Sequence, residues 1–122
     1  MQSPIFKIVD RKDWESARSK GEFAGAAVDL QDGFIHFSTA LQVRETAEKH
    51  FSGQSNLLLI AVDPDALDES LRWEPSRGGD LFPHLYGNLP FSAVVEEFEL
   101  PWDGEKHQFP ATATGIGGKD AT

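Results

Sequence analysis

The stretch Phe82-Pro83-His84-Leu85-Tyr86-Gly87-Asn88-Leu89-Pro90 is the part of the chain around which we expect the fold to be arranged. Read as an extended strand, it places Phe82, His84 and Tyr86 on one face, because successive side chains of a strand alternate. Pro83 favours an edge strand or a strand start, since proline has no N–H for a ladder hydrogen bond. The glycine, asparagine and proline that follow predict a tight turn. The strand therefore presents an imidazole and a phenol side by side.

Two further predicted strands carry polar side chains at the same spacing. His36 and Ser38 are two residues apart in one of them, and Arg72 and Glu74 in the other. A spacing of two is the strand period, so each pair shares a face. The alternatives are a solvated charged face for the second pair and a core histidine satisfied by its neighbours for the first. Three such pairs favour one polar cleft, because convergent polar groups mark binding sites.

Backbone groups near these strands are also suited to binding an anion. Thr39 and Gln42 match a capping box that opens a helix. The N–H groups at the start of this helix, beside Ser38 and Thr39, are available to an anion. Arg77 and Gly78 lie in a predicted loop whose glycines allow close approach to a phosphate, although a Gly-Gly pair is a weak signal.

The order of the elements predicts an α+β fold. Strands are expected at residues 5–9, 57–62 and 92–100, and helices at residues 11–20 and 40–51. Most strands follow the two helices instead of alternating with them. This order favours a mainly antiparallel, curved or split sheet.

Two segments have no periodic pattern. Residues 22–31 contain a Gly-Ala-Ala core, which indicates a loop that lies close over another part of the molecule. Residues 103–122 are polar and then rich in Ala, Thr and Gly. We therefore expect a single domain over residues 1–102, followed by a flexible tail over residues 103–122.

The composition excludes several classes of protein. The chain has no cysteine, which excludes disulfides and thiolate chemistry and favours a reducing compartment. Its start has no signal-peptide pattern, and its longest apolar run, residues 57–62, is too short to cross a membrane. Twenty acidic against eleven basic residues give a formal charge of −9, which argues against nucleic-acid binding. We therefore expect a cytoplasmic protein without a membrane or nucleic-acid partner.

Metal and hydrolase chemistry are weaker hypotheses. His36 and His84 with a carboxylate such as Glu74 would form a two-histidine, one-carboxylate metal set. No H-x-H or H-x-x-x-H spacing supports this set, so we expect no metal. A serine hydrolase is weaker still, because Ser38 lies outside any G-x-S-x-G elbow.

The motifs G-F-I-H-F-S at residues 33–38 and F-P-H-L-Y-G at residues 82–87, with Arg72-Trp73-Glu74 between them, resemble those of a small bacterial family. That family is classed only as a domain of unknown function, and the resemblance covers residues 5–100. The family is grouped with the ADP-ribosyltransferase-like fold, a split, curved, mainly antiparallel sheet that holds NAD in a central cleft. The resemblance therefore implies this fold, with two helices in the N-terminal half, and NAD as a ligand and substrate.

Roles for particular residues follow from the same resemblance. In ADP-ribosyltransferases of the His-Tyr-Glu type, a strand histidine and a following hydroxyl residue bind the ribose and the nicotinamide amide, and His36 and Ser38 match them. Tyr86 is the one tyrosine of the chain and corresponds to the tyrosine that stacks on nicotinamide. A late-strand glutamate supports the oxocarbenium-like transition state in these enzymes. Glu96 and Glu97 have the right place in the chain order, but no motif surrounds either.

The RNA 2′-phosphotransferases are a related branch that uses histidine and arginine residues. The resemblance would then assign these roles to Arg72, Arg77 and His84. The acidic net charge argues against an RNA substrate.

Together these observations predict one cleft with a catalytic and a ligand-binding part. The expected catalytic residues are His36, Glu74, His84 and Tyr86, with Glu74 as the carboxylate beside His36. The expected ligand-binding residues are Ser38, Thr39, Arg72, Arg77, Gly78 and Phe82. The function we expect is binding of NAD or a related phosphorylated nucleotide, with ADP-ribosyl or phosphoryl-ribosyl transfer as the chemistry. The alternatives are a non-catalytic ligand-binding or partner-binding domain that retains the fold, and a metal-dependent enzyme.

Overall fold

The computed structural model describes residues 3–110. Within them the strands form two three-stranded sheets, β1-β4-β8 and β3-β6-β5, and a two-stranded pair, β2-β7. In chain order the elements are β1 (Ile5–Asp10), α1 (Arg11–Arg18), β2 (Glu22–Phe23), α2 (Ala27–Asp32), β3 (Ile35–His36), α3 (Val43–His50), β4 (Leu57–Val62), β5 (Leu71–Pro75), β6 (Leu81–Leu85), β7 (Leu89–Pro90) and β8 (Val94–Leu100), with 3₁₀ turns at Pro64–Ala66, Arg77–Gly79 and Phe91–Ala93. No helix among these residues has the length and apolar composition needed to cross a membrane.

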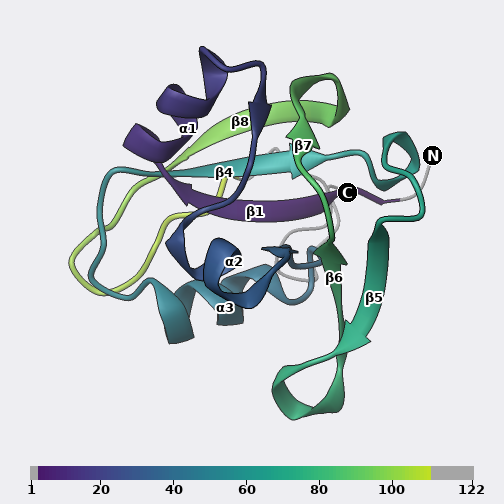
Figure 1. Ribbon diagram of the computed structural model, residues 1–122. Helices are drawn as coiled ribbons and strands as arrows, with labels where there is room; N and C mark the ends of the chain where they lie inside the picture. Colours follow the sequence, from purple (N-terminus) through teal and green to yellow (C-terminus); the bar gives the residue numbers. More distant parts are fainter. Residues whose placement is uncertain (1–2, 111–122) are drawn as a thin grey trace.

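β4 is the centre of the first sheet. All six of its residues are buried, as the continuous apolar run predicts. Alternate side chains point into two core clusters, one that includes Trp14 of α1 and one that includes Val43 of α3. The two helices therefore cover opposite faces of this sheet (Figure 1).

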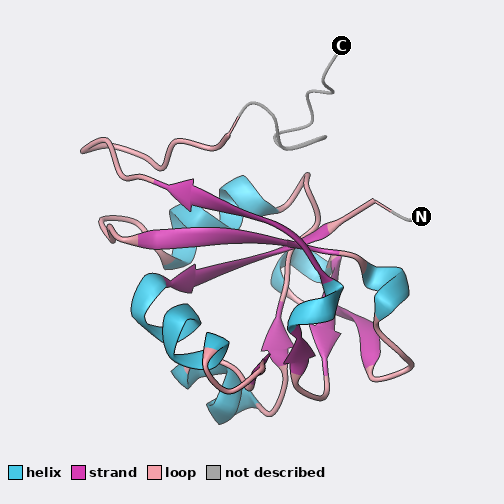
Figure 2. Ribbon diagram, turned by 90° about the horizontal axis from the view of Figure 1, so that it is seen from above, coloured by secondary structure: helices cyan, strands magenta, loops and turns pink. Residues whose placement is uncertain are grey.

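The second sheet runs roughly across the direction of the first, as both ribbon views show (Figure 2). The segment that follows β3 contacts β1, because Phe6 of β1 and Ser38 exchange backbone hydrogen bonds of 2.7 and 2.8 Å. The paired strands are antiparallel throughout. The expected α+β class and mainly antiparallel pairing are therefore confirmed, while the ADP-ribosyltransferase-like assignment stays a prediction.

The predicted strand at residues 82–86 corresponds to β6, but the expectation from Pro83 of an edge strand or a strand start is wrong, because Pro83 is the middle residue of Leu81–Leu85. β6 lies between β3 and β5. Pro83 accepts a hydrogen bond of 3.0 Å from the N–H of Phe37 and has no N–H with which to return one. The pairing of β3 with β6 stops at His36, so the proline shortens the neighbouring ladder instead of placing its own strand at the edge.

Caps bound α1, and a capping box precedes α3. Asp10 caps α1 by accepting the N–H of Lys12 at 2.8 Å, and Gly21, at φ +85°, donates to Ala17 after the helix. The reciprocal capping box is also present, with Thr39 N–H on Gln42 Oε1 at 3.0 Å and Gln42 N–H on Thr39 Oγ1 at 3.3 Å. This box forms a turn before the regular part of α3 begins.

The expectation of a loop over residues 22–31, and of two helices in the N-terminal half, is wrong. The segment contains β2, which pairs with β7, and the third helix, α2. α2 has six residues, which is too few for a helical period to show in the sequence. The close approach expected from its glycine does occur: Gly25 has φ +120°, and a Cβ there would lie 2.9 Å from Asp29 Cβ.

The chain continues along the domain beyond residue 102, where we expected the tail to begin. His107 is buried, and its Nε2 lies 2.9 Å from the carbonyl oxygen of Gln54. Phe109 packs against the α3 core cluster, with the Arg44 guanidinium 4.8 Å from its ring centre. Residues 111–122 lie outside the described part of the chain, so a flexible tail there stays a prediction.

Candidate functional site

The three polar strand faces meet in one row across the second sheet. His36 of β3 is paired with His84 of β6, and Arg72 of β5 is paired with His84 from the other side. Directly paired residues of antiparallel strands share a face. The two imidazole centres are 5.7 Å apart. The strand faces therefore adjoin one another, but only His36, Ser38 and His84 of the six polar residues line the cavity beside them, so the single cleft and the roles of the residues stay predictions.

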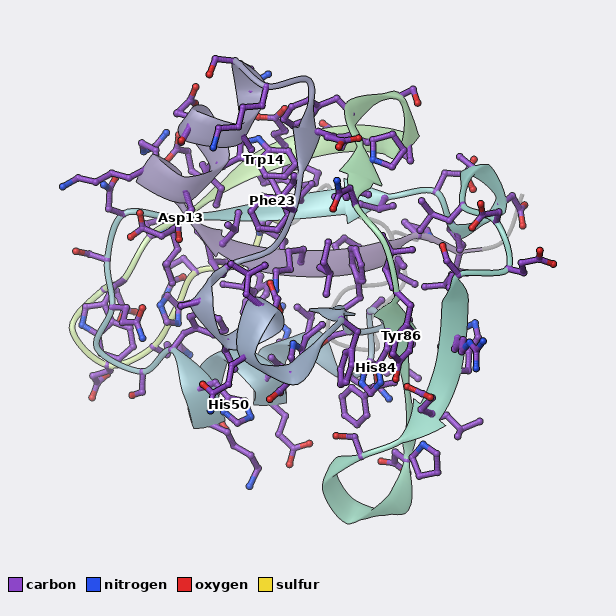
Figure 3. All side chains as sticks on the ribbon, in the orientation of Figure 1. Asp13, Trp14, Phe23, His50, His84 and Tyr86 are labelled. Atoms are coloured by element: carbon purple, nitrogen blue, oxygen red, sulfur yellow. The ribbon has the colours of Figure 1, made fainter. Side chains whose placement is uncertain are left out.

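A carboxylate holds His84 in one orientation. Oε1 of Glu74 accepts the Tyr86 hydroxyl at 2.8 Å and lies 2.8 Å from Nδ1 of His84. Because a carboxylate oxygen only accepts, Nδ1 carries the hydrogen, and Nε2 remains on the opposite side of the ring. Among the side chains that the structure describes, none is found as a hydrogen-bond partner of this Nε2. Figure 3 shows His84 of β6 and Tyr86, which follows the end of this strand, next to each other.

These contacts alter the ionisation of the cluster. The hydrogen bonds from His84 and Tyr86 hold the pKa of Glu74 below its usual value. The hydrogen bond to Glu74 raises the pKa of Tyr86. Glu74 is therefore ionised and Tyr86 is a neutral donor at neutral pH.

Two other carboxylates, and not Glu74, lie beside His36, which corrects our expectation. Nδ1 of His36 is 2.6 Å from Asp29 Oδ1, and Nε2 is 2.9 Å from Asp32 Oδ2. Both oxygens only accept, so the imidazole makes both bonds only when each nitrogen carries a hydrogen. The sequence pattern did not reveal either aspartate, because both belong to the short helix α2.

Asp29 is the most completely bonded side chain of the cluster. It is 1% exposed and contacts Lys7 Nζ at 2.8 and 3.0 Å with its two oxygens. It also accepts the backbone N–H groups of Ala26 at 2.8 Å and His36 at 3.1 Å. Asp29 therefore ties β1, α2 and β3 together at one point.

The buried ion pair shifts the pKa values of both partners. Burial acts to raise the pKa of Asp29, but the hydrogen bond from His36 and the charge of Lys7 outweigh it and lower the pKa to about 2. Burial also lowers the pKa of Lys7, and Asp29 opposes that shift. A lysine at the centre of the otherwise apolar residues 5–9 was the one sequence signal that could have revealed this pair.

Aromatic rings pack over the histidines. Phe34 is stacked on His84, with 4.1 Å between ring centres and 25° between planes, and it also contacts His36 at 4.6 Å and Tyr86 at 5.1 Å. The guanidinium of Arg72 lies 5.5 Å from the centre of the Tyr86 ring. Packing of this kind limits the movement of the imidazoles and holds them in register with each other.

A cavity of about 520 Å³ adjoins the cluster. Three histidines reach it, His36, His84 and His50, and Figure 3 shows that His50 comes from α3 and His84 from β6. Of the expected ligand-binding residues, Ser38 and Phe82 also belong to the wall. Much of the remaining wall is apolar and is formed by Phe6, Phe37 and Phe51.

Other predicted residues have structural partners. Ser38 is buried and its hydroxyl lies 2.8 Å from that of Thr46, while Thr39 belongs to the capping box. Arg77 and Gly78 form the turn between β5 and β6, where Gly78 has φ +70°. These positions do not test whether the four residues bind a ligand.

The two late-strand glutamates lie in the first sheet and not in the row of histidines. Glu96 and Glu97 belong to β8, and both are exposed. Glu97 accepts a hydrogen bond of 2.6 Å from Arg18 of α1. The structure therefore brings neither of them into the cluster of Glu74, His84 and Tyr86.

Among residues 3–110 no group of three or more His, Asp or Glu side chains is arranged to hold a metal ion. The expectation of a metal-free site stays a prediction.

The low pKa of Asp29 predicts a loss of stability in acid. Its pKa is about 2 in the folded protein and 3.8 without the fold, so the folded state favours the ionised form. This pKa difference contributes about 2 kcal/mol to the free energy of unfolding. The contribution is present above about pH 4 and is lost as the pH falls towards 2. Urea unfolding at several pH values between 6 and 2 would measure it. An Asp29→Asn variant should lose less stability over the same window, and an equal loss in both proteins would contradict the assignment.

Comparison with known proteins places the chain in a family that has been defined without an assigned activity. The chain belongs to the family described as "Protein of unknown function (DUF952)", which it matches over residues 8–97. It is also similar to protein CC0527 from Caulobacter crescentus. The crystal structure of CC0527 is 50% identical, with 87% of this chain and 94% of that chain covered and a TM-score of 0.84. Its solution NMR structure is 49% identical, with 87% and 91% covered and a TM-score of 0.77.

No curated protein matches the chain in sequence. The match to the family model confirms the expected membership of a family of unknown function. The grouping of that family with the ADP-ribosyltransferase-like fold stays a prediction.

Proposed function

We propose that this protein binds NAD or a related phosphorylated nucleotide in the cavity beside His36 and His84. The observation that carries the proposal is the pairing of two imidazoles across β3 and β6, each held by a carboxylate and both on the wall of one cavity. Side chains with oriented nitrogens on a cavity wall provide specific hydrogen bonds to a ligand. The cavity volume of about 520 Å³ lies within the range of small-molecule sites.

The wall of the cavity carries both aromatic and polar side chains, which suits a ligand with a flat ring and polar groups. Phe6, Phe37 and Phe51 offer apolar and aromatic surface to a base or a nicotinamide ring. His84 offers Nε2 to a hydroxyl group of the ligand, and Ser38 lies on the same wall. A ribose with attached rings and phosphates combines these two chemical characters.

His84 is the residue best prepared for proton transfer. Its Nδ1 hydrogen is fixed on Glu74, so in the neutral ring Nε2 is an acceptor that can take the proton of a ligand hydroxyl. Ribosyl transfer also builds positive charge at the sugar carbon, which a nearby carboxylate stabilises. Glu74 is the carboxylate that supports His84 here, whereas Glu96 and Glu97 lie on β8.

Nucleotide binding is tested by calorimetry with NAD, ADP-ribose and AMP. We expect His84→Ala and His36→Ala each to weaken binding by about 1–3 kcal/mol, because each removes a hydrogen-bonding partner from the ligand. Glu74→Gln should weaken binding as well, since the amide no longer fixes the His84 ring as strongly. Glu69→Gln removes the same charge from an exposed position and should bind like the wild type. Circular dichroism would establish that each variant is folded.

The same protein samples decide between catalysis and binding alone. Release of nicotinamide from NAD that is lost in His84→Ala would support ribosyl transfer. Nucleotide binding without release would favour the non-catalytic alternative. Absence of binding heat with every nucleotide would contradict the proposed function.

A further inference from the structure

The two carboxylates on His36 differ in how firmly they are held. Asp29 is 1% exposed and is bonded by Lys7, by two backbone N–H groups and by the imidazole. The side chain of Asp32 is 43% exposed, and its contact in the cluster is with Nε2 of His36 at 2.9 Å. Asp32 is also the last residue of α2, where the partial negative charge of the helix end disfavours a carboxylate.

When both nitrogens of His36 carry a hydrogen, as its contacts with two carboxylates require, the charges of the cluster balance only with Asp32 included. Lys7 and His36 in their protonated forms and Asp29 in its ionised form carry one net positive charge. Asp32 neutralises this charge at the edge of the ring that faces the cavity, since both Asp32 and His36 belong to the cavity wall. Any anion at the same position would neutralise it equally well.

We propose that the Nε2 edge of His36 is an anion-binding subsite of the cavity, at which Asp32 takes the place of a phosphate or carboxylate group of the ligand. The ligand displaces Asp32 when it binds. Where this ligand is a nucleotide, the inference rests on the proposed function. A charged N–H donor forms short, strong hydrogen bonds with either anionic group. Displacement costs little, because a half-exposed ion pair contributes only about 0–1 kcal/mol.

The neighbouring imidazole narrows the ligand class. The ring of His84 is centred 5.7 Å from that of His36, and Nε2 of the neutral ring is able to accept a hydrogen bond. One molecule can therefore place an anionic group on His36 and a hydroxyl group on His84 if the two groups are a few bonds apart. Phosphorylated sugars and hydroxy acids have this arrangement.

The test compares the wild type with Asp32→Asn and Asp32→Ala. We expect both variants to bind inorganic phosphate and AMP about fivefold more tightly, since the competing contact is removed. Uncharged adenosine should bind within about twofold of wild type, because the subsite contributes nothing to it. Glu48→Gln is the matched control: it removes one negative charge from an exposed position on α3, a helix that also lines the cavity, without removing a carboxylate from His36. Acetate tested beside phosphate distinguishes a carboxylate ligand from a phosphate ligand.

NMR of the histidine rings gives a second measurement that does not require a nucleotide. In the wild type and in Asp32→Ala, phosphate should shift the ring signals of His36 and leave those of His107 in place. If phosphate shifts His36 while no nucleotide binds any of the proteins, the subsite stands and the proposed function fails. If nucleotides bind but Asp32→Asn and Asp32→Ala have wild-type affinity for phosphate and AMP, the subsite is overturned and the proposed function stands. Absence of any phosphate effect on His36 in all of the proteins overturns the subsite as well.

Discussion

Replacing Asp29 by asparagine should lower the free energy of unfolding by about 3–5 kcal/mol, the cost of leaving one partner of a buried ion pair without its counter-charge. The partner is Lys7, which is 4% exposed and has its ammonium group 2.8 Å from Asp29. The asparagine can replace only part of the hydrogen bonding, because its NH₂ group does not accept bonds from the lysine or from the imidazole. Chemical denaturation with urea would measure the loss.

Two further variants separate the charge effect from other causes. Removing both charges, as in Lys7→Met with Asp29→Asn, should recover a large part of the lost stability, because no unpaired buried ion remains. Asp13→Asn changes an exposed aspartate in the first turn of α1 and should cost less than about 1 kcal/mol. If Asp29→Asn were no more harmful than Asp13→Asn, Asp29 would not be the anchor of this site.

Replacing Trp14 by alanine should destabilise the protein by about 3–5 kcal/mol, the range for truncating a large buried aromatic residue. Trp14 is 0% exposed and belongs to the core cluster shared by the two sheets. Its ring centre is 5.4 Å from that of Phe23 and 4.8 Å from that of Phe91, so its loss leaves a cavity between α1, β2 and the turn before β8. Figure 3 shows Trp14 and Phe23 together between α1 and the strands.

Trp14→Phe should cost markedly less than Trp14→Ala. The Nε1 atom of Trp14 is buried and has no hydrogen-bond partner among the described residues. Phenylalanine retains most of the apolar contact. It also removes the unsatisfied N–H donor, whose burial costs the wild-type protein about 1–3 kcal/mol. Equal losses for the two variants, measured by thermal and urea unfolding, would show that packing volume is not what makes Trp14 important. As a control, folded Trp14→Phe should bind ligand with the affinity of the wild type, because Trp14 lies outside the cavity wall.

Much of the candidate site could be predicted because its spacing is local. His84 and Tyr86 are two residues apart, as are Arg72 and Glu74, and a strand places such residues on one face whatever the rest of the chain does. The capping box of Thr39 and Gln42 was predictable for the same reason, since both partners lie within one turn. The buried strand β4 followed from its continuous apolar run.

The partners of His36 could not be predicted in this way. Asp29 and Asp32 lie in a helix of six residues, and Lys7 comes from a strand more than twenty residues earlier in the chain. Their contacts depend on the bridge between Phe6 and Ser38, which brings β1 against the end of β3. No pattern within a short window of sequence carries that information.

Because alternation and capping depend on neighbouring residues, the amino-acid sequence alone indicated which strand faces are polar, the start of α1 at Arg11 and the α+β class, whereas α3 begins at Val43, after its capping box. Only the tertiary structure decided that Pro83 lies in a central strand, that His36 is paired with His84, and that Asp29 and Asp32, and not Glu74, hold the His36 ring. The physical reason is that strand order and register are set by the burial of both core clusters at once. The pattern of apolar residues can be read from the sequence, but which residues of distant segments contact each other depends on the packed fold.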